Sequence, residues 1–319
     1  MSPILVSIII PCYNVEDYVG ECLDSAINQT YRPIEIIAVD NNSTDKTLDI
    51  LRDYERRYPD LITVLEKKKQ GAPAARNKGM SVASGEWLQF LDADDLLMER
   101  KIANQVNLIE GSPDAWMVVG THIYQYLGGQ EVILYPDEGN VFKAALKSDL
   151  GYTVSNLFRK VGENLQPIWN INLNGAQDTN FIFDYIKTFG QKVIYDKSIC
   201  TITRERPSGQ ITRSNPILFF ESCIQFHLSA IAYLKKSHLN FYENNELIIL
   251  DNLYYVIYSA SLANIKFGYK KLKELLPFDY YPDYKRENRI TFIHSIGFMW
   301  LGFSNYVKLR KFLMKKFCI

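Results

Sequence analysis

The sequence predicts an α/β protein with a mostly parallel central sheet covered by helices on both faces, followed by a helical C-terminal region. Three observations lead to this prediction. Apolar runs alternate with helically spaced segments over the first hundred residues, as in chains that build parallel sheets. Polar residues follow three of the apolar runs. Beyond Pro216 the pattern is helical, rich in Tyr, Phe and Leu.

The first half alternates predicted strands and helices in order. We expect strands at residues 6–11, 34–40, 62–65 and 87–91, because each is a short apolar run. Helical spacing predicts helices over residues 16–29 and 72–83, and a further helix that packs through Leu48, Leu51 and Tyr54. Ser43 and Thr44 are expected to provide the N-cap of that helix.

The pattern changes after residue 115. Residues 116–135 predict short strands joined by a turn at Gly128 and Gly129. A helix over 176–190, a strand near 193–195 and a polar loop over 203–216 follow. We expect a nucleotide-binding domain over residues 1–215 and a helical region over 216–319.

Composition narrows the class of protein. The 319 residues include 36 Lys plus Arg and 36 Asp plus Glu, which argues against nucleic-acid binding through net charge. The five cysteines show no paired spacing, so we expect a reducing, cytoplasmic compartment. No signal-peptide pattern is visible at the start. The apolar stretches 247–262 and 291–303 are interrupted or too short for a bilayer span of about 20 residues.

The strand ends carry the chemistry, because a parallel sheet binds ligands at the carboxyl ends of its strands. Asp92 and Asp94 follow the fourth strand two positions apart, a spacing that suits a hard divalent cation held by carboxylate oxygens. Alternatively, Asp94 or Asp95 caps a helix starting near Leu97.

The first two strand ends suggest a nucleotide pocket. Asp40 closes an apolar strand and could accept hydrogen bonds from a base imide or a ribose hydroxyl, or it could be a turn residue. Tyr13 could stack on a base or be a packing aromatic. The chain lacks the Gly-x-Gly-x-x-Gly and Walker A patterns, which argues against dinucleotide and P-loop folds.

Four segments together resemble family 2 glycosyltransferases of the GT-A fold, whose sheet is Rossmann-like. They are residues 6–14, 36–45, 71–79 and 85–95. The resemblance implies an inverting enzyme of polysaccharide or cell-envelope biosynthesis that uses a UDP-sugar and Mn2+ or Mg2+. It also implies residue roles. The base pocket would contain Pro11, Tyr13 and Asp40; Arg76 would lie beside the nucleotide, Asp92 near the ribose and sugar, and Asp94 on the metal.

The same resemblance implies a general base in the second half. The family shows a Glu-Asp pair at the start of a helix, and here Gln177 and Asp178 occupy these positions. Asp178 would take the proton of the acceptor hydroxyl. Alternatively, Asp178 only caps the helix.

The remaining expectations concern the acceptor side. The arginines of the polar loop, with Arg206 the foremost candidate, could close over a diphosphate, or the loop could be merely solvated. The basic, apolar segment 308–317 could rest on an anionic membrane near a lipid-linked acceptor, or dock as a terminal helix. The aromatic C-terminal helices could form a homodimer surface or cover a glycan acceptor. Two rival functions remain, a catalytically silent nucleotide-sugar-binding protein and a sugar-nucleotide pyrophosphorylase.

Overall fold

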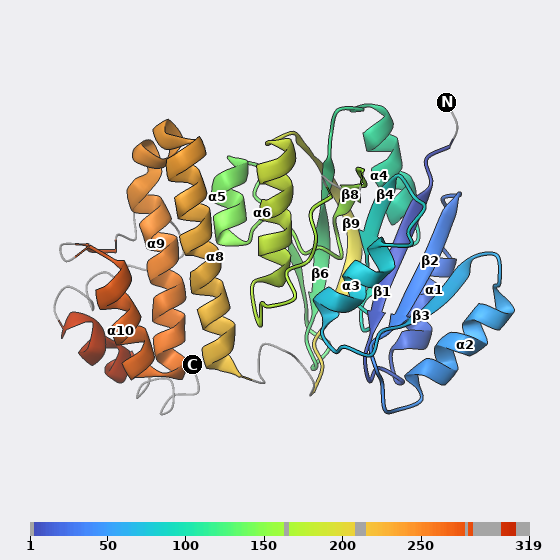
Figure 1. The fold of residues 1–319 in the computed structure, drawn as a ribbon, viewed down its shortest axis with the longest axis horizontal. Helices are drawn as coiled ribbons and strands as arrows, with labels where there is room; N and C mark the ends of the chain where they lie inside the picture. Colours follow the sequence, from blue (N-terminus) through green and yellow to red (C-terminus); the bar gives the residue numbers. More distant parts are fainter. Residues whose placement is uncertain (1–2, 163–165, 208–214, 278–279, 283–300, 311–319) are drawn as a thin grey trace. The chain divides into compact units, whose positions relative to one another are not determined.

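The computed structural model describes residues 3–162, 166–207, 215–277, 280–282 and 301–310 (Figure 1). The chain divides into two compact units. Unit 1 comprises residues 1–172 and 177–208, and unit 2 comprises residues 173–176 and 209–319.

The sheet of unit 1 begins with a parallel block. Its spatial order is β3-β2-β1-β4, formed by β3 (Ile62–Glu66), β2 (Ile34–Asp40), β1 (Val6–Cys12) and β4 (Trp87–Phe90). In register, the last residue of β1, Cys12, lies beside Asp40, the last residue of β2. The carboxyl ends of these strands therefore meet at one edge of the sheet, as the sequence predicted.

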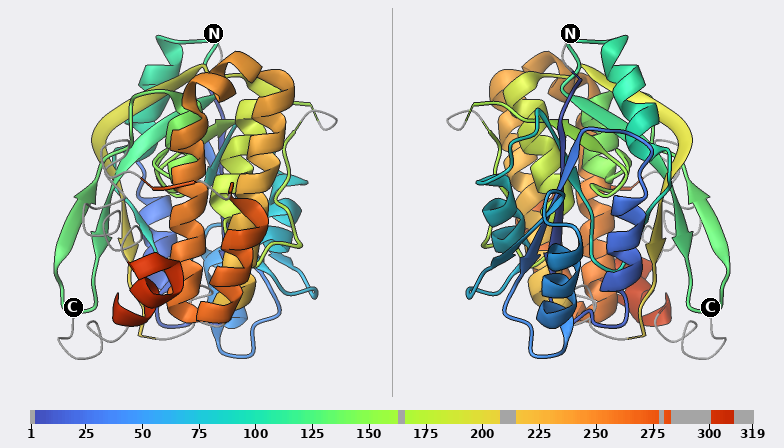
Figure 2. Two further views of the ribbon diagram at one scale, coloured as in Figure 1. Left: turned by 90° about the vertical axis from the view of Figure 1, so that its left-hand side faces the viewer. Right: turned by 90° about the vertical axis from the view of Figure 1, so that its right-hand side faces the viewer.

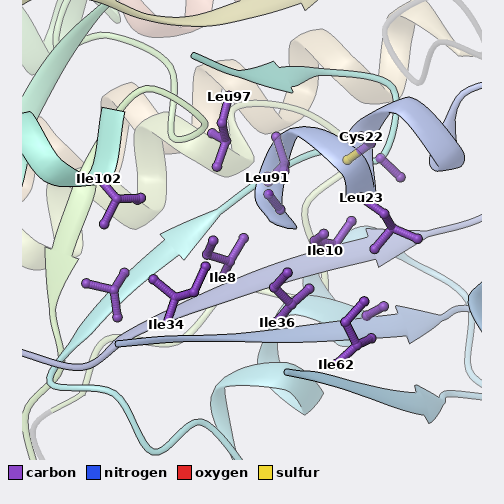
Figure 3. Close-up of a cluster of buried hydrophobic side chains, with 14 of the residues drawn as sticks. Ile8, Ile10, Cys22, Leu23, Ile34, Ile36, Ile62, Leu91, Leu97 and Ile102 are labelled. Carbon is purple, nitrogen blue, oxygen red and sulfur yellow. The ribbon is translucent and has the colours of Figure 1, made fainter. Parts of the chain in front are cut away.

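Helices cover both faces of this sheet. On one face, alternate residues of β1 pack against α1 (Val19–Ile27), α2 (Thr47–Arg57) and α4 (Lys101–Glu110) in a core that includes Ile8, Leu23 and Ile102 (Figure 3). On the other face lies α3 (Ala72–Met80). A Cβ on Gly79 of α3 would lie 2.5 Å from the Ile9 side chain, so the absence of a side chain allows this close approach.

The second half of unit 1 adds strands to the same sheet in the order β8-β6-β9-β5. These are β8 (Leu157–Arg159), β6 (Met117–Gln125), β9 (Val193–Arg204) and β5 (Leu96–Leu97), and β7 (Glu131–Leu134) pairs with β6. The β6–β7 hairpin, predicted from Gly128 and Gly129, stands out at an edge in both side views (Figure 2). The described part of unit 1 also contains α5 (Val141–Lys147) and α6 (Gln177–Phe189). The predicted α/β fold class is confirmed.

Three local expectations were wrong. The helix after β2 begins at Thr47 with Lys46 at the N-cap, and neither Ser43 nor Thr44 caps it; their polar groups bond the loop after β1 instead. The predicted helix over 16–29 is shorter, Val19–Ile27. The loop predicted over 203–216 begins two residues later, at residue 205, because β9 continues through Arg204.

Unit 2 is helical in its described part. It contains α8 (Pro216–Ser237), α9 (Leu239–Ala263), α10 (Ile265–Leu275) and a helix over 301–310. Its core is rich in tyrosine and includes Tyr254, Tyr258 and Tyr306. By length and composition alone, α8 is the one described helix that could cross a membrane, and a third of its most apolar window is buried. The basic segment expected at 308–317 lies largely outside the described residues.

Candidate active site at the carboxyl ends of the strands

The loops that follow β1 and β2 are bound to each other through side chains. The Asn14 Oδ1 atom accepts from the Thr44 N–H at 2.8 Å, and Asn14 has a φ of 49°, in the left-handed region. The Glu16 carboxylate accepts from the Lys46 N–H at 2.9 Å, and the Thr47 hydroxyl accepts from the Val15 N–H at 2.9 Å. The side-chain oxygens thus satisfy backbone donors that two separate loops would leave to water.

Asp40 is the last residue of β2, from which the second loop leaves, and it is 3% exposed. Its Oδ2 atom accepts from the N–H groups of Asn42 and Ser43 at 3.1 and 3.3 Å. Its buried Oδ1 atom has no hydrogen-bond partner among the described residues. An unpaired buried carboxylate oxygen is costly, so Asp40 fits a position that accepts a hydrogen bond from a bound ligand.

The other two residues expected at a base pocket lie at the end of β1. Pro11 pairs with Val39 of β2 and is partly buried, and the Tyr13 side chain is 45% exposed. Asn41, next to Asp40, binds the 67–71 loop, because its amide donates to the carbonyls of Lys67 and Lys69 at 2.9 and 2.8 Å. The polar residues of this strand end therefore fix the chain that leads into α3.

Arg76 of α3 is held by a carboxylate and an indole. Its Nη2 atom donates to Asp92 Oδ1 at 2.5 Å, and its guanidinium lies 4.2 Å from the centroid of the Trp169 ring. The Arg76 side chain is 5% exposed, whereas that of Asp92 is 43% exposed. Burial lowers the pKa of Arg76, but Asp92 and Asp178 raise it by more. A buried, permanently charged guanidinium thus sits beside an accessible carboxylate.

Trp169 is fixed by residues distant in sequence. The Asn77 side chain donates to the Trp169 carbonyl at 2.8 Å and accepts from its N–H at 2.9 Å. The indole stacks on Phe181 of α6 with centroids 4.3 Å apart and planes 9° from parallel. Trp169 therefore lies between the Arg76 guanidinium and the helix that carries Asp178.

The structure rejects the capping alternative for Asp94 and Asp95. Leu96–Leu97 is strand β5, and the next helix begins only at Lys101. Asp94 instead pairs with Arg206, whose Nε atom lies 2.8 Å from Asp94 Oδ2. Asp95 is 6% exposed and accepts from the Arg204 N–H at 2.9 Å.

The electrostatics of the cluster follow from burial and crowding. Burial raises the pKa of Asp94, and Asp92 adds to the rise while Arg206 opposes it. Burial also raises the pKa of Asp95, with Asp94 and Asp92 contributing. Three carboxylates this close disfavour one another's charge, and an added cation would relieve the repulsion.

The residues present fit a divalent cation that shares its ligands with a substrate. Asp92 and Asp94 supply carboxylate oxygens, which Mg2+ and Mn2+ prefer. Among the described residues no group of three His, Cys, Asp or Glu side chains could hold a metal by itself. Mg2+ is commonly bound by one or two carboxylates together with substrate phosphates, and Asp94 with the exposed Asp92 matches that pattern.

Asp178 is the second residue of α6, within the helix, so it does not act as the N-cap. Its Oδ1 atom accepts a hydrogen bond from the Thr153 hydroxyl. Burial raises the pKa of Asp178; Arg76 opposes the rise and Asp92 adds to it. Asp178 thus belongs electrostatically to the same site as Arg76 and Asp92.

Five of the predicted residues lie together in unit 1, and the other three, Pro11, Tyr13 and Asp40, lie at the ends of β1 and β2. Hydrogen bonds, ion pairs and electrostatic interactions connect Asp92, Arg76 and Asp178, and Asp94 with Arg206. Sequence reasoning missed Asn77, Thr153 and Trp169. Asn77 lies next to Arg76 within a segment that the family resemblance already covered, whereas Trp169 stands in a stretch without periodicity. Arg213, also considered for the loop, lies outside the described residues.

Comparison with known proteins places these residues in context. A family model described as Glycosyl transferase family 2 matches residues 7–160 of the chain. An uncharacterized glycosyltransferase of Haemophilus influenzae is 28% identical over 85% of the chain and its own full length. The poly(ribitol-phosphate) beta-glucosyltransferase of Bacillus spizizenii is 44% identical over 29% of the chain, and the match spans 15% of that protein. The chain therefore matches only a small part of this relative.

Another relative has a defined donor and acceptor in its name. The UDP-Glc:alpha-D-GlcNAc-diphosphoundecaprenol beta-1,3-glucosyltransferase WfaP of Escherichia coli is 41% identical over 33% of the chain and 41% of its own length.

Solved structures share the fold. Residues 1–349 of TarS from S. aureus, in complex with UDP-GlcNAc, superpose with a TM-score of 0.62 at 16% identity, covering 98% of the chain and 91% of that structure. The mannosyltransferase PcManGT from Pyrobaculum calidifontis, with GDP-Man and Mn2+, gives a TM-score of 0.54 at 17% identity, covering 99% and 88%. These likenesses establish a GT-A-like fold.

Proposed function

We propose that the chain is a family 2 glycosyltransferase that moves a sugar from a UDP-sugar to a hydroxyl of a glycan or lipid-linked acceptor, with inversion at the anomeric carbon. The observation that carries the proposal is the convergence of Asp92, Arg76 and Asp178 in one site. Such a site can hold a nucleotide diphosphate and remove a proton close to it.

On this proposal the donor lies over the ends of β1 and β2. The unpaired Oδ1 atom of Asp40 would accept from the N–H of the uracil ring. Tyr13, 45% exposed, would stack on the base, and Pro11 would line the same pocket. Arg76 and Asp92 would face the ribose and the sugar. The Asp40 Oδ1 atom, which accepts no hydrogen bond from the described residues, favours a base with an imide donor. Uracil has such a donor and cytosine lacks it.

The diphosphate would lie between Asp94 and Arg206. A Mn2+ or Mg2+ ion held by Asp94 would supply charge neutralisation for the departing diphosphate. Arg206, which pairs with Asp94 in this structure, has the forked donors that suit phosphate oxygens. The metal in the PcManGT complex supports use of a divalent cation.

Asp178 would act as the general base. Its raised pKa brings the carboxylate nearer to the range in which proton transfer from a hydroxyl is efficient. The Thr153 hydroxyl, which donates to Asp178 Oδ1, would keep the carboxylate oriented. General-base catalysis of this kind contributes roughly 10²–10⁴-fold to a rate.

The first experiment is a calorimetric screen of UDP, GDP, dTDP and CDP, each with and without Mn2+. We expect UDP to bind most tightly with the metal, and Asp94→Ala to abolish the metal-dependent part of the affinity. If no nucleotide binds, either with or without Mn2+, the proposed donor site is refuted.

The rival functions are separated by substitution of the base. Asp178→Asn in a transferase keeps UDP binding and loses sugar transfer, whereas a silent binding protein has no turnover to lose. A pyrophosphorylase would instead form a nucleotide sugar and pyrophosphate from UTP and a sugar phosphate, a reaction that pyrophosphate release detects directly.

A further inference from the structure

A tightly fixed turn holds two side chains beside Asp178. Asn156 donates to the Leu150 carbonyl at 2.9 Å and accepts from the Gly120 N–H at 3.0 Å. The Ser155 N–H donates to the Tyr152 carbonyl at 2.9 Å. Thr153 of this turn is the residue whose hydroxyl bonds Asp178. The position of Tyr152 relative to the carboxylate is therefore set by the adjacent residue and by backbone hydrogen bonds.

Tyr152 is packed on one side and accessible on the other. Its ring lies over the His122 ring, with centroids 4.3 Å apart and planes 32° from parallel. His122 is 3% exposed, whereas Tyr152 is 43% exposed. The His122 ring packs against one face of the Tyr152 ring, and a substantial part of Tyr152 remains accessible for contact with another molecule.

More aromatic rings continue from this pair along β6. His122 and Tyr124 are two residues apart in β6 and so share one face of the sheet, and Tyr126 follows the strand, which ends at Gln125. The rings of Tyr124 and Tyr126 meet edge to face at 4.8 Å, and both tyrosines interact electrostatically with Tyr152. We call these four residues, His122, Tyr124, Tyr126 and Tyr152, the aromatic platform.

Two carboxylates lie near the aromatic platform. Asp178 and Asp95 both raise the pKa of Tyr152, after the larger effect of burial. Burial lowers the pKa of His122 to about 4, so its imidazole is neutral at neutral pH. A neutral aromatic surface beside two carboxylates suits an uncharged molecule better than a phosphodiester chain.

We propose that Tyr152, supported by His122, is the stacking surface for the acceptor, and that the acceptor presents an uncharged pyranose ring there with its hydroxyl toward Asp178. A pyranose has a face of C–H groups whose partial positive charge matches the negative face of an aromatic ring. An open-chain polyol phosphate has no such face. This inference rests on the proposed function, because it assigns Asp178 as the base.

The test is the binding of small acceptor probes to the full chain in the presence of UDP and Mn2+. Saturation-transfer NMR measures this binding. The probes are methyl β-glucopyranoside, methyl N-acetyl-β-glucosaminide and ribitol 5-phosphate. We expect at least one glycoside to bind, with affinity about 3–10-fold weaker in Tyr152→Ala and within twofold of wild type in Tyr152→Phe. Tyr135→Ala, which removes a tyrosine that is 68% exposed, is the matched control and should bind like wild type.

Four results would overturn the inference. They are no binding of either glycoside to the wild-type chain, equal binding by Tyr152→Ala, equal losses in Tyr152→Phe and Tyr152→Ala, and tighter binding of ribitol 5-phosphate than of the glycosides. Thermal midpoints of the variants, with Tyr152→Leu as a volume-retaining change, show whether the fold is intact. The UDP affinity in each sample reports separately on the proposed donor site, so failure of the aromatic platform and failure of the proposed function are distinguishable.

Discussion

Trp169 offers a test of how Arg76 is positioned. Its indole is 1% exposed and lies between the Arg76 guanidinium at 4.2 Å and the Phe181 ring at 4.3 Å. Trp169→Ala removes both contacts and leaves a cavity in the core of unit 1. Replacement of a buried aromatic by alanine costs about 3–5 kcal/mol, so we expect the free energy of unfolding to fall by that amount.

The same substitution should weaken nucleotide binding for a separate reason. Without the indole, the Arg76 guanidinium loses its stacking partner and keeps its hydrogen bond to Asp92. Immobilising a rotamer-rich side chain at an interface costs about 0.5–1.5 kcal/mol, and this cost would then fall on binding. The dissociation constant for UDP with Mn2+ should rise about 2- to 12-fold.

Trp116 provides the matched control. It is 3% exposed and stacks on Tyr185 at 5.7 Å, in the same unit. Urea unfolding followed by circular dichroism should show comparable destabilisation in Trp116→Ala and Trp169→Ala. Calorimetry at a temperature where both are folded should show weaker UDP binding only in Trp169→Ala. Wild-type affinity in Trp169→Ala would refute the reasoning, since Asp92 alone would then be sufficient to position Arg76.

Three further substitutions test the base, the packing and a buried charge. Asp178→Asn should lower kcat by about 10²–10⁴-fold without changing the UDP dissociation constant. In the wild type, kcat should fall as the pH falls through the raised pKa of Asp178, because only the carboxylate form accepts a proton. Steady-state kinetics from pH 5 to 9 measure both effects. Gly79→Ala should destabilise the chain by about 1–3 kcal/mol in urea unfolding, because the new Cβ would lie 2.5 Å from Ile9; unchanged stability would show that the strand and helix can separate at little cost. Burial lowers the pKa of Lys101 to about 7, so the unfolded chain binds more protons above that pH and stability should rise with pH, by up to about 1.4 kcal/mol per unit. Lys101→Met should flatten this dependence in unfolding curves at pH 7 and 9, and an unchanged slope would contradict the assignment.

The parallel half of the sheet could be predicted because its signals are local. Each apolar strand is continuous, and polar residues follow three of the four strands. Asp40 and Asp92 could therefore be placed at one edge of the sheet from strand order alone. The family resemblance then supplied roles that spacing could not, including that of Asp178.

The wrong cap at Ser43, the choice left open at Asp94 and the failure to find Trp169 share a physical cause. Asp, Ser and Thr bond backbone amides equally well in a helix cap and in a loop that faces another loop. The choice at Asp94 and at Ser43 depends on neighbours from elsewhere in the chain, such as Arg206 and Asn14. The same holds for Trp169, which meets Arg76 from a segment that has no repeating pattern. Long-range contacts of this kind leave no trace in a short window of sequence.

The mutual bonding of the loops after β1 and β2 has a thermodynamic consequence. Because Asn14, Glu16 and Thr47 hold backbone amides across the two loops, these loops are ordered before any nucleotide arrives. Ligand association then resembles the docking of rigid bodies, with little loss of chain entropy. The heat-capacity change on binding should reflect the buried surface of the nucleotide alone, and the amide protons of Val15, Thr44 and Lys46 should exchange slowly although they lie outside every strand and helix.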